Sequence, residues 1–377
     1  MRALFVVGTR PEVIKVAPVI LECRTRPDIE TIVCSTGQHR QMLDQAFGSF
    51  DITPDIDLGL MTANQSLTDL SAAALTALGG VFESQNPDAV IVQGDTTTAM
   101  IGALAAYYHR IPIVHIEAGL RTWDRFNPFP EEGNRAIIDQ IADYCMAPTS
   151  GSQKNLLKTG VGQERITVTG NTAVDAILGM AEKVSGNAAP ESLPAEIGQS
   201  IANGVRTIVV TGHRRESFGK DFESICRALK RIVDENPDTQ IVYPVHLNPN
   251  VREPVFRILK DEERVHLVDP LPYSEFVWLL ANSFIVLTDS GGIQEEVPSL
   301  NKPILVMRSV TERPEGVDAS CSKLVGVDEN TIVENINELL TDESAYARMI
   351  KADNPYGDGK ASKRIADVIQ EIPVKND

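Results

Sequence analysis

Three acidic residues follow short apolar segments in the first half of the chain, in the loops where strands of a parallel sheet would end. Asp95 comes after residues 89–92, Glu117 comes after residues 111–116, and Glu131 lies in the next loop. Carboxylates held near one another raise one another's pKa, which makes a carboxyl group usable as a general acid or base near neutral pH. The three acids are therefore candidates for proton transfer, although Asp95 taken alone is equally well explained as a helix N-cap.

Basic residues stand at comparable positions. Arg10 and Lys15 follow the first apolar segment through the turn GTRPE, close to the start of a helix, where anions are favoured. A capped helix with a solvated arginine is the less favoured alternative for this segment. His213, followed by two arginines, comes after residues 207–210 and predicts a phosphate clamp whose histidine can also move a proton near neutral pH. A charged surface turn is the alternative.

The clearest phosphate-binding pattern is TDSGGIQEE at residues 288–296. Ser290, Gly291 and Gly292 would bring backbone N–H groups at a helix start against a diphosphate. Glu296, about one turn into that helix, would accept hydrogen bonds from both hydroxyls of a ribose. The pattern predicts a nucleoside diphosphate site, and because the chain has no GxGxxG after its first strand we do not expect NAD.

Short apolar runs that alternate with helical segments indicate the scaffold that must position these residues. The runs are residues 4–7, 31–34, 89–92, 111–116, 166–168, 207–210, 240–245, 265–268, 284–287 and 303–307. Runs without apolar/polar alternation are typical of strands buried on both faces, and their alternation with helices predicts parallel sheets. Residues 185–204, rich in Gly, Pro, Ser and Asn, separate two such series. The expected fold class is α/β, with two Rossmann-like doubly wound domains facing a central cleft.

Composition limits the class of function. The chain has 377 residues, of which 42% are hydrophobic, which is enough for two domains with separate cores. Its net charge of −17 disfavours nucleic acid and anionic membranes as partners. No segment approaches the roughly 20 apolar residues of a membrane span. Five scattered cysteines show no metal-ligand or disulfide spacing, so we expect a cytoplasmic protein without a metal site.

Eight motifs taken together resemble the non-hydrolysing UDP-N-acetylglucosamine 2-epimerases. In chain order they are GTRPE, GDTTT, EAGLRT, FPEEGNR, TGHRRESFG, YPVHLNPNVREP, TDSGGIQEE and ERPEG, and they cover nearly the whole chain. The resemblance implies a GT-B-like fold, a homodimer, no cofactor, and reversible conversion of UDP-GlcNAc to UDP-ManNAc for bacterial surface polysaccharides. The expected domains are residues 1–170, on which residues 361–377 pack back, and residues 171–360.

The resemblance also assigns roles to individual residues. Uridine diphosphate contacts fall on Arg10, His213, Ser290, Gly291, Gly292, Glu296 and Arg313, with Phe276 and the backbone near Leu271 close to the uracil. Around the sugar and the departing phosphate it places Lys15, Asp95, Glu117, Glu131 and His213, and Arg135 joins the substrate-binding set. The family often has Gln at the position of Leu271. Some members bind UDP-GlcNAc as an activator through residues that match Gln38, His39, Gln41 and His246, but Asn64 stands where that site has an arginine.

The chemistry implied by the resemblance is elimination and re-addition. A base removes the proton from carbon 2 of the sugar while UDP leaves from carbon 1, and UDP then adds back to bound 2-acetamidoglucal with proton delivery to the opposite face. The alternatives are a GT-B glycosyltransferase, an epimerase of a related UDP-2-acetamido sugar, and a UDP-sugar sensor that has lost catalysis. Three acids in one half of the chain favour proton transfer over acceptor-dependent glycosyl transfer, and the same acids together with His213 argue against a sensor that has lost catalysis.

Overall fold

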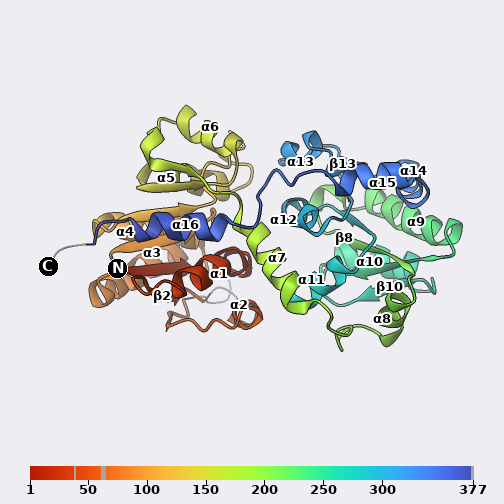
Figure 1. Cartoon of the computed structure of the whole chain (residues 1–377), viewed down its shortest axis with the longest axis horizontal. Coiled ribbons are helices and arrows are strands. Elements are labelled where there is room, and N and C mark those ends of the chain that lie inside the picture. The colour runs from red at the N-terminus through yellow and green to blue at the C-terminus, as the bar shows by residue number, and fades with distance from the viewer. Residues whose placement is uncertain (38–39, 61–64, 375–377) are drawn as a thin grey trace. The chain divides into compact units, whose positions relative to one another are not determined.

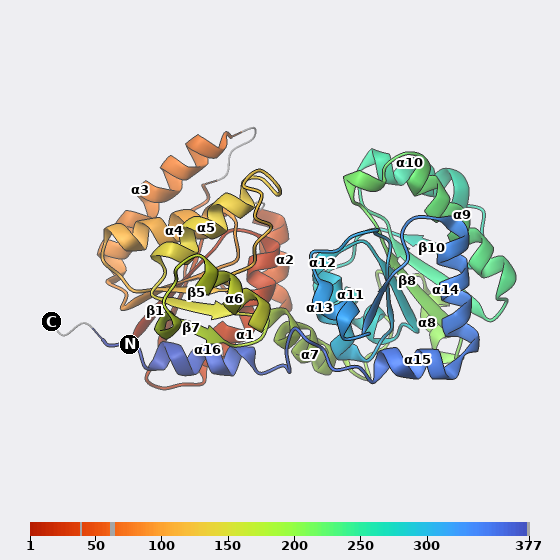
Figure 2. The same ribbon diagram turned by 90° about the horizontal axis from the view of Figure 1, so that it is seen from above.

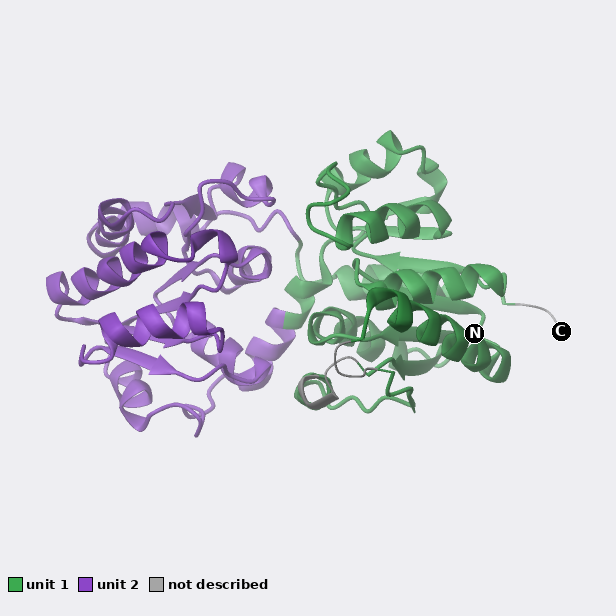
Figure 3. Ribbon diagram, turned by 180° about the vertical axis from the view of Figure 1, so that it is seen from behind, with its two compact units in different colours: residues 1–176, 357–377 green, residues 177–356 purple. Residues whose placement is uncertain are grey.

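The computed structural model describes residues 1–37, 40–60 and 65–374. The chain divides into two units (Figure 3). Unit 1 comprises Met1–Ala176 together with Gly357–Asp377, and unit 2 comprises Ile177–Tyr356. Helix α7 (Thr172–Val184) contains the point at which unit 1 passes into unit 2.

Unit 1 is built on a parallel sheet whose described strands have the order β3-β2-β1-β4-β5-β6-β7. These strands are β1 (Arg2–Val7), β2 (Glu30–Ser35), β3 (Ile56–Asp57), β4 (Ala89–Gln93), β5 (Ile113–Ile116), β6 (Tyr144–Ala147) and β7 (Ile166–Val168). The strand order reverses between β1 and β4. At such a switch point the loops after neighbouring strands diverge, and open α/β sheets bind their ligands there.

Helices cover both faces of this sheet (Figure 2). Helices α3, α4 and α5 pack in succession on one face, and α1 and α16 pack together on the other. The helices of unit 1 are α1 (Arg10–Arg24), α2 (Arg40–Ser49), α3 (Leu67–Gln85), α4 (Thr97–Tyr108), α5 (Glu131–Ile141), α6 (Ser150–Lys158), the 3-10 turn η1 (Gln163–Arg165) and α16 (Ala361–Gln370). The carboxylate of Asp175 fixes the start of α16 by accepting hydrogen bonds from the backbone N–H groups of Ala361 and Ser362, at 3.2 and 2.8 Å.

Unit 2, coloured from green to blue in Figure 1, repeats the plan. Its described strand order is β10-β9-β8-β11-β12-β13, which reverses between β8 and β11. Its strands are β8 (Arg206–Thr211), β9 (Thr239–Pro244), β10 (Val265–Val268), β11 (Ile285–Thr288), β12 (Ile304–Val306) and β13 (Ser322–Leu324). Its helices are α8 (Ala195–Ala202), η2 (Arg215–Ser217), α9 (Lys220–Glu235), α10 (Pro249–Leu259), α11 (Tyr273–Ala281), α12 (Gly291–Glu296), η3 (Val297–Leu300), α13 (Pro314–Asp318), α14 (Glu329–Thr341) and α15 (Glu343–Ile350).

The strands read as continuous apolar runs because both of their faces are covered. All five residues of β4 are buried, as are all four of β11. Each of the ten apolar runs overlaps a strand, and the doubly wound α/β fold class is confirmed. Strands β3, β6 and β13 have no counterpart among the ten predicted runs. The first has only two residues, and the second (Tyr-Cys-Met-Ala) has no β-branched side chain to separate it from a helix end. None of the described helices is long and apolar enough to cross a membrane.

Candidate active site

Glu117 is held by two donors at the end of β5. Lys15, one turn into α1, donates to both carboxylate oxygens of Glu117, each at 2.7 Å from Nζ. The side-chain amide of Gln93, the last residue of β4, donates to the same carboxylate. The backbone of Glu117 has φ +67°, a left-handed conformation that a residue with a side chain adopts only at a cost. The fold therefore places Glu117 on a strained backbone beside the switch point, buries its carboxylate there and pairs that carboxylate with the predicted lysine.

Asp95 follows β4 and is held from α5. Arg135 donates from Nε to the Asp95 carboxylate at 2.7 Å, and the amide of Asn134 donates to the Asp95 backbone carbonyl at 2.8 Å. Thr96, not Asp95, is the N-cap of α4, because its hydroxyl accepts a hydrogen bond from the backbone N–H of Ala99 at 3.0 Å. The alternative in which Asp95 only caps that helix is therefore wrong.

Glu131 is the first residue of α5, and one of its carboxylate oxygens, Oε2, is buried without a hydrogen-bond partner among the described residues. Its neighbour Glu132 has the opposite surroundings. Burial alone would raise the pKa of Glu132, but the backbone N–H of Thr122 and the guanidinium groups of Arg121 and Arg135 lower it. Glu132 is thus a structural anion, whereas Oε2 of Glu131 has no such partner among the described residues.

The prediction missed Glu12, although it lies inside the GTRPE motif. Its buried carboxylate accepts hydrogen bonds from the backbone N–H groups of Gly8 and Thr9, at 3.1 and 2.6 Å, and from the Thr96 hydroxyl at 2.6 Å. Glu12 therefore joins the loop after β1 to the loop after β4. Burial raises the pKa of Glu12 to about 7, against these donors, which lower it. The spacing Thr9-x-x-Glu12 is a capping-box pattern that would have identified it.

Arg10, by contrast, is exposed at the start of α1, and the structure gives it no ion-pair partner among the described residues. Its position beside the first turn of α1 agrees with an anion contact, because this end of the helix carries the positive partial charge.

In unit 2, Asp289 joins the two strand-end loops that carry the predicted phosphate residues. Its carboxylate accepts hydrogen bonds from the backbone N–H groups of His213 and Arg214, at 2.7 and 2.8 Å, and its other oxygen lies 3.4 Å from Nδ1 of His213. Asp289 is buried, and the His213 side chain is about half exposed. The loop after β8 is thereby fixed to the loop after β11 at the switch point of this sheet. Sequence reasoning did not single out Asp289.

The glycine-rich turn begins helix α12, with Ser290 as its N-cap and Gly291 as its first residue. Arg313 lies over Gly291, since a Cβ at that glycine would stand 3.3 Å from the Arg313 guanidinium carbon. Glu295 receives a hydrogen bond from Arg313 Nε at 2.8 Å. In the same way a Cβ at Gly292 would stand 3.4 Å from the Glu296 carboxylate. A cation and a carboxylate therefore flank the two glycines, as a diphosphate and a ribose require.

The two residues expected near the uracil lie on and just before α11. Leu271 is buried in the loop before this helix, and Phe276 is half-buried within its first turn. Burial, followed by the nearby charge of Glu296, raises the pKa of Tyr273 well above its ordinary value. Tyr273 therefore lies close to Glu296, which connects α11 with the end of α12.

The residues matched to an activator site are only partly described. Gln38 and His39 lie outside the described residues, as does Asn64, and Gln41 is placed in α2 without a described side chain. The imidazole of His246 stacks on that of His213, with ring centroids 5.3 Å apart and an interplanar angle of 17°. Partial burial and then the charge of His213 lower the pKa of His246. His246 therefore contacts a predicted substrate residue directly.

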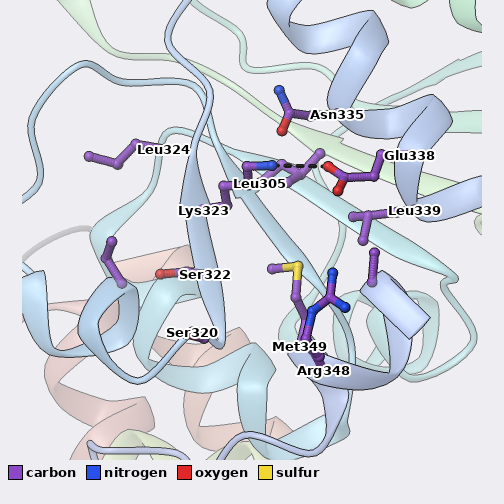
Figure 4. A pocket seen from close by; sticks show the side chains of 12 residues that line it. Leu305, Ser320, Ser322, Lys323, Leu324, Asn335, Glu338, Leu339, Arg348 and Met349 are labelled. Atoms are coloured by element: carbon purple, nitrogen blue, oxygen red, sulfur yellow. Dashed lines mark hydrogen bonds and ion pairs between the residues drawn. The ribbon is translucent and has the colours of Figure 1, made fainter. Parts of the chain in front are cut away.

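A pocket of about 440 Å³ lies elsewhere in unit 2, over β12 and β13 and beside α14 and α15 (Figure 4). Leu305, Leu339 and Met349 form part of its wall, and Lys323 is paired with Glu338 across it. None of the predicted site residues lines it, so its size does not make it the candidate active site. Within the described part of the chain, no group of three or more His, Cys, Asp or Glu side chains is arranged to hold a metal ion.

Comparison with known proteins identifies the family. The family model for UDP-N-acetylglucosamine 2-epimerase matches residues 21–370. The chain belongs to the UDP-N-acetylglucosamine 2-epimerase family. The family member from Escherichia coli strain K12 is 50% identical over 373 residues, which are 98% of each chain. The one from Yersinia pestis is 49% identical over 377 residues, covering 99% of this chain and 100% of the relative.

A solved structure of a family member extends the comparison to the fold. The UDP-GlcNAc 2-epimerase of Neisseria meningitidis bound to UDP-GlcNAc is 42% identical and superposes with a TM-score of 0.87, covering 98% of this chain and 99% of that chain. The expected fold of two Rossmann-like domains in the GT-B-like class is confirmed by this likeness together with the two doubly wound sheets.

Proposed function

We propose that this chain is a non-hydrolysing UDP-N-acetylglucosamine 2-epimerase that interconverts UDP-GlcNAc and UDP-ManNAc without a redox cofactor. The observation that carries the proposal is the arrangement at the switch point of unit 1. There a family-typical lysine, Lys15, holds the buried carboxylate of Glu117, and Arg135 holds Asp95 on the adjacent strand end. Carboxylates fixed by cations on neighbouring loops are suited to moving protons at a bound sugar.

The reaction proceeds by elimination and re-addition. One carboxylate takes the proton from carbon 2 as the bond between carbon 1 and the diphosphate oxygen breaks, which leaves a carbon–carbon double bond in 2-acetamidoglucal. The diphosphate oxygen then re-forms its bond to carbon 1 while a carboxylic acid delivers a proton to the opposite face of carbon 2. Asp95, Glu117 and Glu131 are the groups that we assign to these transfers.

Unit 2 supplies the groups that stabilise the departing UDP. We assign the diphosphate to Ser290, Gly291, Gly292 and Arg313 and the ribose to Glu296, because cation, carboxylate and helix start lie together there. Phe276 and the backbone near Leu271 take the uracil. His213 completes the phosphate contacts that we assign in this unit, and we also assign a phosphate contact to Arg10, the first residue of α1 in unit 1. These donors would stabilise the negative charge that develops on the diphosphate as the bond to carbon 1 breaks.

Nuclear magnetic resonance of the purified chain with UDP-GlcNAc alone tests the proposal. We expect signals of UDP-ManNAc to grow to a constant ratio, without added NAD. A glycosyltransferase would instead leave UDP-GlcNAc unchanged until an acceptor is added and would then release UDP. An epimerase of a different 2-acetamido sugar would leave UDP-GlcNAc unchanged and act on the uronate or diacetamido form. A sensor would show saturable binding with no product.

The assigned acids are tested separately by Asp95→Asn and Glu117→Gln. Each variant should lose a factor of about 10² or more in kcat, because a general acid-base group contributes roughly that much. The control is Glu338→Gln, which removes an exposed carboxylate of unit 2 that pairs with Lys323. Near-normal turnover of either acid variant would remove that residue from the mechanism.

We further propose that UDP-GlcNAc activates the enzyme through Gln38, His39, Gln41 and His246. The stack of His246 on His213 supports this, because it gives an activator a direct contact with a residue of the substrate site. Activation predicts a sigmoidal dependence of rate on UDP-GlcNAc, with no conversion of UDP-ManNAc until some UDP-GlcNAc is added. Hyperbolic kinetics in both directions would contradict it.

A homodimer through the α4–α5 face is also proposed. Tyr107 and Tyr108, at the end of α4, are 57% and 63% exposed, and with Ile141 they line a hollow of about 540 Å³. Exposed aromatic side chains around a hollow are typical of protein contact surfaces. Light scattering should give twice the 41.1 kDa of one chain, and Tyr107→Glu with Tyr108→Glu should give one chain's mass. A wild-type monomer at assay concentration would contradict the proposal.

The biological setting follows from the substrate. We propose that the enzyme acts in the cytoplasm and supplies ManNAc units for bacterial surface polysaccharide. Five buried free cysteines agree with a reducing compartment.

A further inference from the structure

His115 is a fully buried polar residue in the middle of β5, a strand whose four residues are all buried. Its Nε2 lies 2.8 Å from the backbone carbonyl of Gly94. Gly94 immediately precedes Asp95, and its own φ of +71° makes the turn that carries Asp95 out of the strand. The imidazole therefore holds the backbone of the Asp95 loop from within the core.

The other nitrogen of the ring is held by α5. Nδ1 of His115 lies 3.0 Å from the carboxylate of Asp139, which is also buried. The same carboxylate oxygen accepts a hydrogen bond from the backbone N–H of Gly119, at 3.3 Å, two residues after Glu117. Asp139 lies on α5, whose first residue is Glu131. One pair of buried side chains thus joins the three segments that carry Asp95, Glu117 and Glu131.

The hydrogen-bonding roles follow from the partners. A carbonyl oxygen can only accept, so Nε2 carries the hydrogen toward Gly94. The Asp139 carboxylate lies within hydrogen-bond distance of Nδ1, so each ring nitrogen has a partner. The ring cannot turn over without losing both bonds, so the imidazole acts as a rigid spacer of fixed length between α5 and the Asp95 loop.

The free-energy cost of burying two polar side chains argues against a role for His115 that is only space-filling. A buried polar pair stabilises a fold no better than apolar side chains of the same shape, and the second Asp139 oxygen is buried with no hydrogen-bond partner among the described residues. The flanking positions of β5, Val114 and Ile116, show that apolar side chains suit this strand. A requirement other than core packing is therefore needed to explain a histidine at position 115.

We propose that His115, held by Asp139, is a positioning residue that fixes the Asp95 loop relative to Glu117 and Glu131. The inference rests on the proposed epimerase function for its catalytic consequence, while its structural content, the restraint of Gly94 and Asp95, stands without it. His115 touches no substrate atom in this account and acts through Asp95.

Two isosteric substitutions separate the two bonds of the ring. In His115→Gln the amide nitrogen replaces Nε2 and can still donate to Gly94, whereas in His115→Asn it replaces Nδ1 and can reach only Asp139. Both variants lose one buried hydrogen bond and part of a ring, so melting temperature should fall similarly in the two. The positioning role predicts that hydrogen exchange in residues 94–98 speeds up about tenfold in His115→Asn and much less in His115→Gln.

Kinetics give the second readout. We expect kcat of His115→Asn to fall about 10²-fold at nearly constant KM, because displacement of a reacting group costs rate and not binding, and kcat of His115→Gln to stay far closer to wild type. In an Asp95→Asn background the further loss from His115→Asn should disappear, since both changes remove the same contribution. Should His115→Asn not fold, His115→Leu takes its place, because a leucine has no donor for the Gly94 carbonyl.

Equal exchange rates in the two His115 variants would overturn the inference whatever the enzyme's activity. So would equal kcat in two folded variants, or full additivity with Asp95→Asn. Absence of epimerase activity in the wild-type chain would instead refute the proposed function, and the exchange experiment would still decide the restraint of the Asp95 loop.

Discussion

The Lys15–Glu117 pair allows stability and activity to be separated in one set of variants. Lys15→Met keeps most of the length and apolar stem of the lysine but removes its charge, and it leaves the Glu117 carboxylate with only the Gln93 amide among the donors described above. The side chains of Lys15 and Glu117 are 16% and 5% exposed, so water cannot replace the lost ammonium. Removing one partner of a buried ion pair costs about 3–5 kcal/mol.

This loss should be visible in calorimetry. For a domain of the size of unit 1, each kcal/mol corresponds to about 2–4 °C, so the transition of unit 1 should move down by about 6–20 °C in Lys15→Met. The double variant Lys15→Met with Glu117→Gln has no uncompensated charge, and its unfolding free energy should be at least about 2 kcal/mol higher than that of Lys15→Met. Replacing both members of a buried ion pair with uncharged side chains often changes stability little. Its kcat should stay as low as that of the single variants.

The exposed pair of the same residue types gives the control. Lys323 and Glu338 are 3.0 Å apart with side chains 50% and 43% exposed, and Lys323→Met should cost less than about 1 kcal/mol. A loss of less than about 1 kcal/mol in Lys15→Met, as is typical of exposed pairs, would contradict a buried ion pair at this position. A double variant no more stable than Lys15→Met would contradict it as well.

Three further predictions concern other contacts of the two units. Burial raises the folded-state pKa of Glu12 from 4.5 to about 7, so between these pH values the folded chain holds a proton that the unfolded chain loses. The unfolding free energy of wild type should therefore fall by about 3 kcal/mol relative to Glu12→Gln between pH 4.5 and 7, and no further above. A constant difference between the two proteins in urea unfolding across this range would contradict this prediction. Arg313→Ala should weaken UDP binding about 10- to 100-fold by titration calorimetry, since it removes a charge-assisted phosphate contact, whereas the exposed control Arg257→Ala should bind as wild type. Gly119→Ala should destabilise the chain by about 2 kcal/mol or more, because its Cβ would stand 2.4 Å from the Ser152 carbonyl oxygen. The control Gly133→Ala, whose Cβ would meet nothing within 4 Å, should be neutral or stabilising. Equal unfolding free energies of the two variants would contradict the close approach at Gly119.

The scaffold was readable from sequence where burial leaves a local signature. Strands that are covered on both faces appear in the sequence as runs rich in β-branched residues, as in residues 89–92 and 207–210. From these runs the parallel sheets were predicted. Strand β6 lacks that signature, because its place in the sheet depends on pairing with β5 and β7 and not on its own propensity. Strand order was likewise not readable, since pairing is a long-range property.

The candidate site was predictable to the extent that it lies at strand ends. Asp95, Glu117, His213 and Ser290 all follow strands, and parallel topology alone brings such residues to one edge of each sheet. Lys15 and Arg135, which hold Glu117 and Asp95, were predicted, but other residues that hold the site were missed. Asp289 acts on a backbone 76 residues away and Asp139 on a histidine 24 residues away, and neither separation leaves a pattern in the sequence. Of these supports only Glu12 had a local signal, the capping box.

Conversion of UDP-GlcNAc in D2O, followed at carbon 2 of the product, tests the central claim most directly. We expect every molecule of UDP-ManNAc formed by the purified chain to carry solvent deuterium at carbon 2. The original proton leaves with a carboxylate, and its replacement reaches the opposite face from a group that is equilibrated with solvent. Product that retains the original hydrogen at carbon 2 would contradict elimination and re-addition.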